Sequence, residues 1–337
     1  MNRFLTLSLL GLLGCTLPVK VGFLPGITPT PTPTATPSAP TAVPTPLAPL
    51  GSDKNPLVLA LPPSGQPQPD ALNAGKTLTS LLEKSTGYSV VSVISPTETA
   101  LIQSFGLGNA HIGVLSPFGY LLASNEGVAQ AAFGREQNGQ MFYGAELLAR
   151  SDAGFTAYFD PVQGKNLADA PVALAQLRDK KPCWTDELSP SGYVVPLGYL
   201  RRAEVTTREG AFLTSHPGVV RALYAGQICD FGATYVDARL YPGLEDELPN
   251  VLKKILVIWQ MPPIIPYETL VYGVGMPIEM QRVLSRAFVD LMGTPDGQST
   301  MQTLYGFGAM QAVQDSQYAD FRQVVKDSGL ELSTLVK

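Results

Sequence analysis

The sequence predicts an α/β fold with two similar lobes and mostly parallel sheets. Short apolar or β-branched runs alternate with runs of helical spacing from Leu57 onward. The alternation starts again after Asp169, and the chain ends in helical patterns. The composition is 45% hydrophobic and only 15% charged, which is typical of a globular protein, and the length suffices for two lobes of ordinary domain size.

The first series of elements follows this rhythm closely. LVLAL is short and apolar, and the next run has leucines at helical spacing at 78, 81 and 82. Pro117 is well placed in the first turn of a helix. In order, the pattern predicts a strand at 57–61, a helix at 76–84, a strand at 88–95, a helix at 99–106, a strand at 111–115 and a helix at 117–123.

The second series repeats the same alternation. It predicts strands at PCW (182–184), AFLT (211–214), FGATY (231–235) and the ILVIW run that begins at Ile255, with helices from Tyr193 and from Pro217. Helices are predicted at 276–292 and 318–327. Two such units suggest a cleft, because ligands of open α/β sheets bind at the carboxyl ends of the strands.

The N-terminus has the features of an export signal. Arg3 precedes an apolar stretch, Phe4 to Leu13, that is too short to span a membrane. Leu12-Leu13-Gly14-Cys15 resembles a bacterial lipobox, in which a peptidase cuts before a cysteine that receives lipid. The alternative is a plain secretory signal with an incidental cysteine.

A tether follows the cysteine. Residues 27–50 are mostly Pro, Thr and Ala, carry no charge, and cannot bury enough apolar surface to fold. An extended chain of this kind reaches about 70 Å at about 3 Å per residue. The expected organisation is a signal peptide at 1–14, a lipidated Cys15 and tether at 15–55, one lobe from 56–149 and 268–337, and a second lobe from 150–267.

Several function classes are disfavoured by composition. The net charge of −5 and the lack of Lys/Arg runs argue against nucleic-acid binding. His111 and His216 are the only histidines, and no metal-ligand cluster, phosphate-binding loop or nucleophile–base motif is present in the sequence, so neither a metal nor a cofactor is expected. An exported chain could join Cys183 to Cys229, although the sequence does not show that they meet; two buried thiols are slightly favoured.

Three predicted helices begin with hydroxyl side chains and no acid. Ser116 precedes Pro117, Thr214-Ser215-His216 precede Pro217, and Ser189-Pro190-Ser191-Gly192 open the helix that follows PCWTD. Each alone is an ordinary N-cap. Three of them in one chain, on both predicted lobes, favour an anion site, and the first turn of the 189–202 stretch leaves the positive end of its helix dipole free.

The order of these motifs resembles the periplasmic phosphate/phosphite/phosphonate-binding proteins of ABC importers. The resemblance runs from about Leu57 to about Met292. It rests on Leu61-Pro62-Pro63-Ser64, AHIGVLSPFGYLLA, Ser189-Pro190-Ser191-Gly192-Tyr193, Thr214-Ser215-His216, Asp230-Phe231-Gly232-Ala233-Thr234 and Ile265-Pro266-Tyr267-Glu268. It implies a type II periplasmic binding protein: two α/β lobes, a hinge, and an interlobe cleft that closes on the ligand. Crossovers are expected near Ala149–Ser151 and Pro266–Glu268.

The resemblance also implies the ligand-binding residues. Ser189, Ser191, Gly192 and Tyr193 match the family's phosphonate cradle, and Ser215 and His216 match a second segment whose histidine donates to the same oxyanion. Glu268 matches an aspartate that faces a ligand's amine, with Asp237 as a weaker candidate; Ser116 and Ser64 complete the set. Pro190 stands where the family has a threonine, and neither Thr99 nor Leu115 is aromatic as the family often requires, so the ligand stays open among phosphonate, phosphite, phosphate and others.

The leading hypothesis is an extracytoplasmic, lipid-anchored, monomeric binding protein that delivers a small oxyanion to an ABC permease. Alternatives are the same fold with a sulfonate or thiamine precursor as ligand, or a sensory module that presents its ligand to a membrane receptor. An enzyme is disfavoured, because it would need a nucleophile–base pair.

Overall fold

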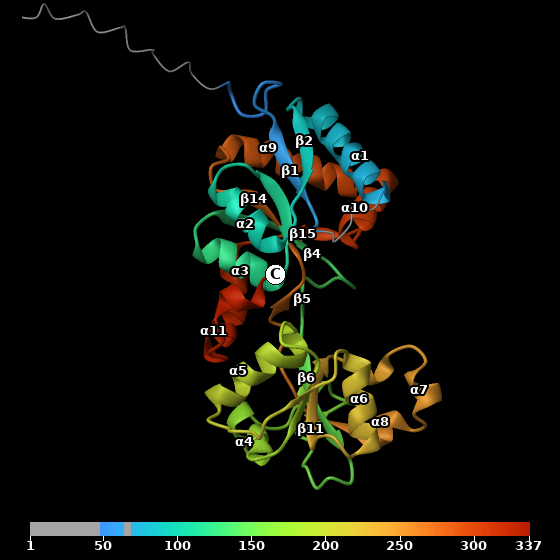
Figure 1. Cartoon of the computed structure of the whole chain (residues 1–337). Helices are drawn as coiled ribbons and strands as arrows, with labels where there is room; N and C mark the ends of the chain where they lie inside the picture. The colour runs from blue at the N-terminus through green and yellow to red at the C-terminus, as the bar shows by residue number, and fades with distance from the viewer. Residues whose placement is uncertain (1–47, 64–68) are drawn as a thin grey trace, which may run out of the picture. The chain divides into compact units, whose positions relative to one another are not determined.

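Two sheets organise the chain in the computed structural model, which describes residues 48–63 and 69–337 (Figure 1). The first sheet has the spatial order β2 (Val90–Ile94), β1 (Leu57–Leu61), β3 (Ile112–Leu115), β14 (Thr269–Gly273), β4 (Ala129–Arg135) and β15 (Met310–Ala312). The second has the order β10 (Ala211–Phe212), β9 (Pro182–Trp184), β11 (Phe231–Tyr235), β6 (Ala145–Arg150) and β12 (Ile255–Gln260).

The two sheets repeat one topology. In each sheet, three neighbouring strands run parallel. An antiparallel strand from a distant part of the chain lies next to them and separates them from a fourth strand of their own direction. That strand is β14 in the first sheet and β6 in the second. The expectation of mostly parallel sheets therefore holds only for one half of each sheet, because the chain that crosses between lobes enters in the opposite direction.

The two crossover segments pair with each other in a short two-stranded ribbon, which is called the hinge below. β5 (Phe142–Tyr143) pairs antiparallel with β13 (Ile265–Pro266), with Tyr143 opposite Ile265. The chain passes between the sheets at 136–144 and again at 261–268. Residues 145–149, expected in the first lobe, form most of β6 and belong to the second, so the first crossover precedes the expected position.

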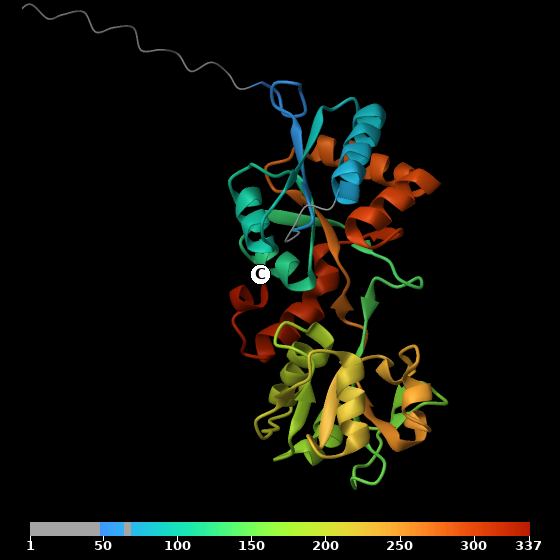
Figure 2. The same ribbon diagram turned by 45° about the vertical axis from the view of Figure 1, so that its right-hand side comes forward.

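Helices cover both faces of the first sheet. α1 (Pro69–Thr86), α9 (Ile278–Met292) and α10 (Pro295–Tyr305) pack on the face that buries Leu57, Leu59 and Leu61. α2 (Glu98–Gly106) and α3 (Pro117–Asn125) share the other core with Ala60. Figures 1 and 2 both show α1 beside β1 and β2. The alternating sides of β1 follow from the two-residue period of a strand.

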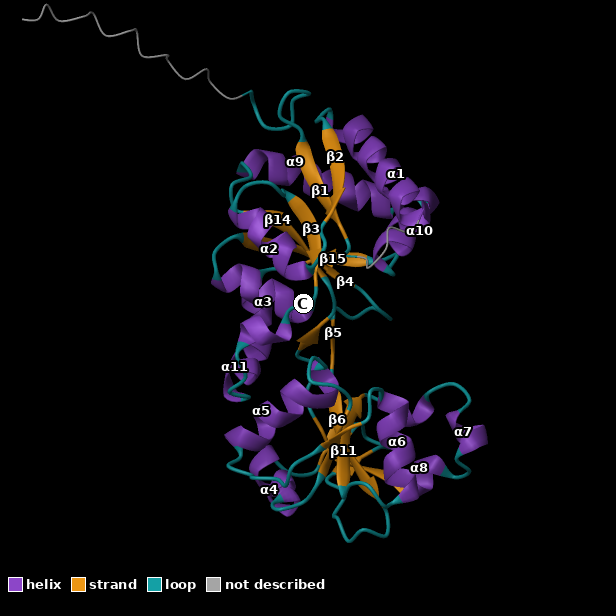
Figure 3. Cartoon of the chain, viewed as in Figure 1, coloured by secondary structure: helices purple, strands orange, loops and turns teal. Residues whose placement is uncertain are grey.

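The second sheet is covered in the same way (Figure 3). α6 (His216–Ala225), α7 (Leu244–Glu247) and α8 (Val251–Lys254) share one core, while α4 (Ala170–Leu174) and α5 (Val195–Arg202) belong to the other. The remaining elements are the hairpin β7 (Phe159–Asp160) and β8 (Lys165–Asn166), the helix α11 (Ala319–Asp327), and the short helical turns η1 (Ala175–Leu177), η2 (Pro190–Val194), η3 (Ala238–Leu240), η4 (Asp315–Tyr318) and η5 (Leu332–Leu335).

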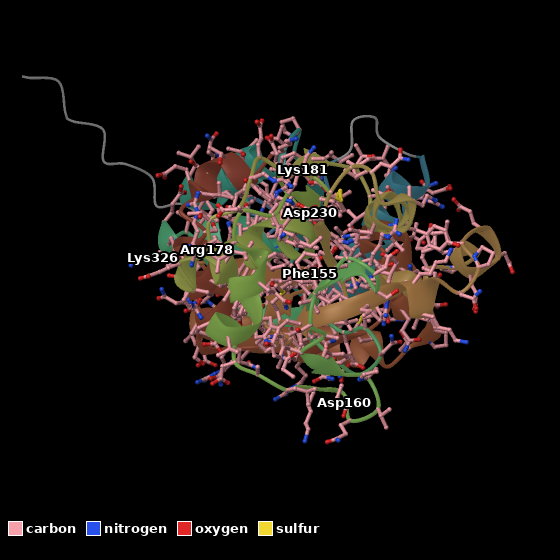
Figure 4. The ribbon with its side chains drawn as sticks, turned by 90° about the horizontal axis from the view of Figure 1, so that it is seen from below. Phe155, Asp160, Arg178, Lys181, Asp230 and Lys326 are labelled. Atoms are coloured by element: carbon pink, nitrogen blue, oxygen red, sulfur yellow. A yellow bond between two sulfur atoms is a disulfide. The ribbon has the colours of Figure 1, made fainter. Side chains whose placement is uncertain are left out.

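Cys183 and Cys229 form a disulfide, so the slightly favoured interpretation of two thiols was wrong. The bond joins β9 to the turn before β11. Figure 4 shows its sulfur atoms close to Lys181 and Asp230, where the Asp230 carboxylate accepts the Lys181 N–H at 2.7 Å. Parallel pairing of β9 with β11 brings the two cysteines together although they are 46 residues apart in sequence.

The C-terminal helix α11 contacts both lobes. Phe321 stacks on Phe118 of α3 with ring centroids 5.7 Å apart, while Asp327 pairs with Arg202 of α5. Gly198 of α5 lies so close that an added β-carbon would be 2.3 Å from the Val324 carbonyl oxygen. The C-terminal segment expected in the first lobe therefore also packs on the second.

Four expectations lie outside the described residues: the signal peptide, lipidation at Cys15, most of the tether, and Ser64. Within 48–63 and 69–337, no helix is long and apolar enough to cross a membrane. The same residues contain no cluster of three or more His, Cys, Asp or Glu side chains that could hold a metal ion.

Candidate functional site

Thr185 joins the two segments that the sequence singled out in the second lobe. It follows β9 directly, and its N–H donates to the Gly192 carbonyl at 3.2 Å. Its own carbonyl accepts the Thr214 N–H at 2.7 Å. Residues 189–193 and 214–216 therefore meet at the carboxyl ends of the parallel strands β9 and β10, where a ligand of an α/β sheet is expected.

The Thr185 hydroxyl is buried without a partner. The residue is 1% exposed, and no hydrogen bond within the described part of the chain uses its Oγ1. Buried hydroxyls are almost always hydrogen-bonded, so an orphaned one points to a bound group. Sequence reasoning missed Thr185, although its place as the first hydroxyl after a buried strand was the available signal.

The helix start at 189–194 is both a capped terminus and a set of donors. Ser189 Oγ accepts the Gly192 N–H at 3.0 Å, and the Ser189 carbonyl accepts the Val194 N–H at 3.0 Å. The helical chain begins with the π-type turn η2 at Pro190, and its first turn contains no acid, as predicted. The first N–H groups of a helix lack partners within it, which leaves those of Ser191 and Tyr193 as donors for an anion.

His216 lies at the start of α6 in a fixed tautomer. Its Nδ1 accepts the Tyr235 N–H at 3.2 Å, so the ring proton is on Nε2. Burial lowers the pKa of His216 to about 4, and the charge of Asp186 only partly opposes this. At neutral pH His216 is therefore an uncharged imidazole with one N–H to donate.

The capping serines retain donor capacity. Ser215 Oγ accepts the Gly218 N–H at 3.1 Å, as Ser189 does for Gly192. A hydroxyl that accepts in this way still has its own hydrogen to give. No residue in the described chain accepts that hydrogen from Ser189 or Ser215, so the capping role and a ligand-binding role are compatible.

Ser191 connects this segment to the hinge. It is 2% exposed, and its hydroxyl lies close to the phenol of Tyr143 in β5. Burial raises the pKa of Tyr143 to about 12, although the nearby Ser191 hydroxyl acts in the opposite direction. The Tyr143 ring stacks on Tyr267, with centroids 4.9 Å apart. A predicted ligand residue thus lies beside a residue of the β5–β13 ribbon.

Glu268 and Arg135 form an ion pair beside Tyr267. Arg135 Nη1 donates to Glu268 Oε2 at 2.9 Å, and the guanidinium lies over the Tyr267 ring, 5.3 Å from its centroid. Arg135 Nε is buried without a partner in the described residues. Glu268, predicted to face a ligand's amine, is therefore already engaged by a cation, and Arg135 is a nearby donor that the sequence analysis missed.

Ser116 lies on the first lobe and is already bonded to a carboxylate. Glu98 Oε1 accepts the Ser116 N–H at 2.5 Å, and Oε2 accepts the Ser116 hydroxyl at 2.7 Å. Ser116 Oγ also caps α3 by accepting the Gly119 N–H at 3.1 Å. Burial, helped by the charge of Glu268, raises the pKa of Glu98.

Asp237 and Tyr193 have structural partners. Asp237 binds the Arg239 guanidinium, with 2.8 Å from Nε to Oδ1. Burial alone would raise the pKa of Asp237, but the Arg239 hydrogen bonds and charge outweigh it and lower that pKa. The Tyr193 ring packs edge-on against Trp184 and Phe212, with centroids 5.5 and 5.1 Å away.

A hollow of about 760 Å³ lies along the hinge, beside these residues. Tyr143 and Tyr267 contribute to its wall, together with Lys165, Asn166 and Gln260. None of the predicted ligand residues lines it, so the donors gathered around Thr185 and this hollow are separate features.

Comparison with known proteins decides the family. The family described as "ABC transporter, phosphonate, periplasmic substrate-binding protein" matches residues 63–318. The chain belongs to this family. The resemblance inferred from the motifs is thereby confirmed, over a span that ends later than Met292. Members of the phosphonate-binding family are extracytoplasmic binding proteins of ABC transporters, not enzymes.

Solved structures share the fold at low identity. XAC2383 from Xanthomonas citri bound to ATP has a TM-score of 0.57 and 15% identity, and the match covers 83% of this chain and 99% of that one. PhnD1 from Prochlorococcus marinus in complex with methylphosphonate has a TM-score of 0.51 and 13% identity over 82% and 99% of the two chains. Mycoplasma hyorhinis Mh-p37, described as a putative thiamine pyrophosphate transporter, has a TM-score of 0.52 and 10% identity over 80% and 98%. Curated protein sequences gave no match. These structures support the two-lobed type II fold.

Proposed function

We propose that this member of the phosphonate-binding family captures a small phosphorus oxyanion and delivers it to an ABC permease. The proposed site lies around Thr185, where residues 189–193 and 214–216 meet. The orphaned, buried Thr185 hydroxyl is the observation that carries the proposal. A related fold binds methylphosphonate in Prochlorococcus marinus PhnD1, which makes phosphonate the first ligand to test.

The proposed cradle consists of neutral donors from three short segments. Thr185 contributes its hydroxyl, Ser189 and Ser215 their capping hydroxyls, and His216 its Nε2–H. The start of the 190–202 helix adds main-chain N–H groups and the positive end of its dipole. Converging neutral donors hold an oxyanion without a cationic side chain, and no acid in the first turn competes with the ligand.

Calorimetric titration with methylphosphonate, phosphite, phosphate, sulfate and a sulfonate tests this function. Thr185→Val removes the hydroxyl with little change in shape. It should weaken oxyanion binding at least about 10-fold, because a hydrogen bond to a charged group contributes about 1.5–3 kcal/mol. The same variant should melt at the wild-type temperature or above, since it also removes an unsatisfied buried group.

Thr300→Val is the matched control. Thr300 is 7% exposed in α10, and its hydroxyl donates to the Asp296 carbonyl at 2.7 Å, far along the chain from the cradle. This variant should lose stability and keep wild-type binding. Unchanged oxyanion affinity in Thr185→Val, or no binding of any oxyanion by the wild type, would refute the proposed site.

We further propose that Cys15 carries a lipid that anchors the protein to the outer face of the cell membrane, with the Pro/Thr-rich segment after Cys15 as the tether. The tether ends earlier than the expected residue 55, because Gly51 accepts the Ser89 N–H and donates to the Asn55 carbonyl within the folded part. The lipobox-like Leu12-Leu13-Gly14-Cys15 supports this proposal. Cys15→Ser should move the protein from the membrane fraction to the soluble one, or stall its processing. A Cys15→Ser protein that stays fully processed and membrane-bound would exclude the anchor.

A further inference from the structure

Glu98 occupies donors on the first lobe that an anion would otherwise use. Its two carboxylate oxygens accept the N–H and the hydroxyl of Ser116, at 2.5 and 2.7 Å. Ser116 is the N-cap of α3, whose first turn has no acid of its own. The carboxylate therefore comes from another helix, because Glu98 is the first residue of α2, 18 positions earlier in the chain.

The fold makes room for this carboxylate. A β-carbon added to Gly119 would lie 2.3 Å from Glu98 Oε1, so only glycine lets the carboxylate reach the start of α3. Glu98 is itself held in place, because its own N–H donates to the Lys337 carbonyl at 2.7 Å. The placement is thus supported from two independent parts of the chain.

Ser116 differs in this respect from the two capping serines of the second lobe. Ser189 and Ser215 accept a helix N–H and keep their own hydrogen available, whereas Ser116 gives its hydrogen to Glu98. Glu98 is also close enough to Glu268 for that charge to act on it, and Glu268 is paired with Arg135 beside Tyr267 and Tyr143. Tyr143 in turn lies close to Ser191, so this group of side chains extends from Glu98 to the proposed cradle.

We infer that Glu98 is a specificity-determining residue that occupies the Ser116 donors in place of a ligand oxygen and so weakens the binding of oxyanions. The inference rests on the proposed function, since it concerns the same ligand. The second lobe then holds the oxyanion alone, and the first lobe contributes only when Glu98 is displaced. The doubly charged forms of these oxyanions are affected most, because they carry the greatest charge toward Glu98 and Glu268.

The test compares the affinity for methylphosphonate and for inorganic phosphate by calorimetry in four variants. Glu98→Ala should bind both at least about 10-fold more tightly than the wild type. Glu98→Gln keeps an acceptor oxygen for the Ser116 N–H but loses the charge, and it should fall in between. Glu83→Ala is the control, because Glu83 also accepts a main-chain N–H, that of Val90 at 2.9 Å, elsewhere in the first lobe. Its affinity should equal that of the wild type.

The double variant Glu98→Ala/Ser116→Ala shows whether the gain in affinity comes from the freed Ser116 hydroxyl or only from the loss of the Glu98 charge. Most of the gain should disappear in it, because the Ser116 hydroxyl would no longer be there to receive the ligand. A gain that survives intact would overturn the inference, as would wild-type or weaker binding in Glu98→Ala. If Glu98→Ala does not fold by circular dichroism, an unchanged affinity in Glu98→Gln refutes the inference equally.

The outcomes also separate this inference from the proposed function. Binding by the wild type without a gain in Glu98→Ala would remove the role of Glu98 and leave the oxyanion site intact. Binding by Glu98→Ala but not by the wild type would support the role of Glu98 and reject oxyanion capture by the native protein. No binding by any variant would reject both.

Discussion

The hydroxyl oxygen of Thr185 lies directly against the α-carbon of Gly192, where a β-carbon would be only 2.0 Å away. Gly192 is therefore required by close approach and not by its backbone angles. The contact holds the end of β9 against the start of the helix, and it brings the orphaned hydroxyl next to main-chain donors.

Gly192→Ala should disrupt this contact. Either Thr185 or the helix start must move, so we expect a loss of about 1–3 kcal/mol in the free energy of unfolding, together with at least 10-fold weaker oxyanion binding. Urea unfolding and calorimetric titration measure the two effects. Gly275→Ala is the control, since nothing lies within 4 Å of a β-carbon at that position, and it should change neither quantity. Wild-type binding in Gly192→Ala would mean that the contact is not part of the site.

Ser191 distinguishes an anion site from an ordinary helix cap. Ser191→Ala should weaken oxyanion binding about 10- to 100-fold by removing a hydroxyl near the ligand. Ser191→Asp should weaken it further, because a carboxylate would take the place of the anion at the helix dipole. Calorimetry on both variants, with circular dichroism to confirm folding, decides the question. If Ser191→Asp binds as tightly as the wild type, this stretch only starts a helix.

His216 should make stability depend on acid pH. Burial lowers its pKa to about 4 in the folded protein, below its ordinary value of 6.5. The folded state resists protonation, so stability is fully present above about pH 6.5 and falls as the pH approaches 4, by up to about 3 kcal/mol. His216→Gln should remove this part of the pH dependence in urea unfolding between pH 7 and 4. The other histidine, His111, is half-buried, and this burial lowers its pKa as well, so His111→Gln is measured in parallel. A pH dependence that persists unchanged in His216→Gln would contradict the assignment.

Glu146 should make the free energy of unfolding depend on pH in the opposite direction from His216. It is 1% exposed in β6, and burial, together with the charge of Asp237, raises its pKa well above the usual 4.5. The folded state therefore binds the proton more tightly, and the stability contributed by this group is lost as the pH rises from about 4.5 through the raised pKa. Glu146→Gln mimics the protonated form and should gain stability relative to the wild type between pH 5 and pH 9. A difference in unfolding free energy that is independent of pH would show that Glu146 is ionised throughout.

The disulfide should contribute substantially to stability. A bond that closes 46 residues restricts the unfolded chain enough to stabilise the fold by about 4 kcal/mol. The double variant Cys183→Ser/Cys229→Ser should lose about that amount in urea unfolding. Reduction of the wild type should produce the same loss, whereas the reductant should have no effect on the variant. Equal stabilities with and without reductant would mean that the bond does not form in solution.

Local sequence patterns predicted much of the fold, but they did not predict where the chain first crosses between the lobes. Leu57–Leu61, Phe231–Tyr235 and the helix start at Pro117 were predictable because apolar runs and capping residues specify them locally. The helix expected from Pro217 begins one residue earlier, at His216. β6 was missed because its sequence, AELLAR, consists largely of good helix formers. Pairing on both sides, with β11 and β12, makes it a strand, and that information is not local. The misplaced first crossover has the same cause.

The candidate site, like the fold, could be predicted from the sequence only in its local parts. Residues 189–193 and 214–216 could be chosen from hydroxyls, prolines and the absence of acids near predicted helix starts. The hydrogen-bonding and ionic partners of the candidate residues could not be predicted in this way. Glu98 reaches Ser116 across 18 residues, and Arg135 reaches Glu268 across 133, so only the folded chain shows that these predicted ligand residues are already engaged.

The Cys183–Cys229 bond closes a ring that contains the whole second-lobe cradle, from Thr185 to His216. β12, β14 and β15 all follow Cys229 in the chain, so both cysteines leave a secretion channel before those strands do. In an oxidising compartment the ring can therefore be sealed while the first sheet still lacks two of its strands. Bacteria that lack their periplasmic thiol oxidase should consequently export this chain with the ring open, and the defect should arise during translocation instead of after folding.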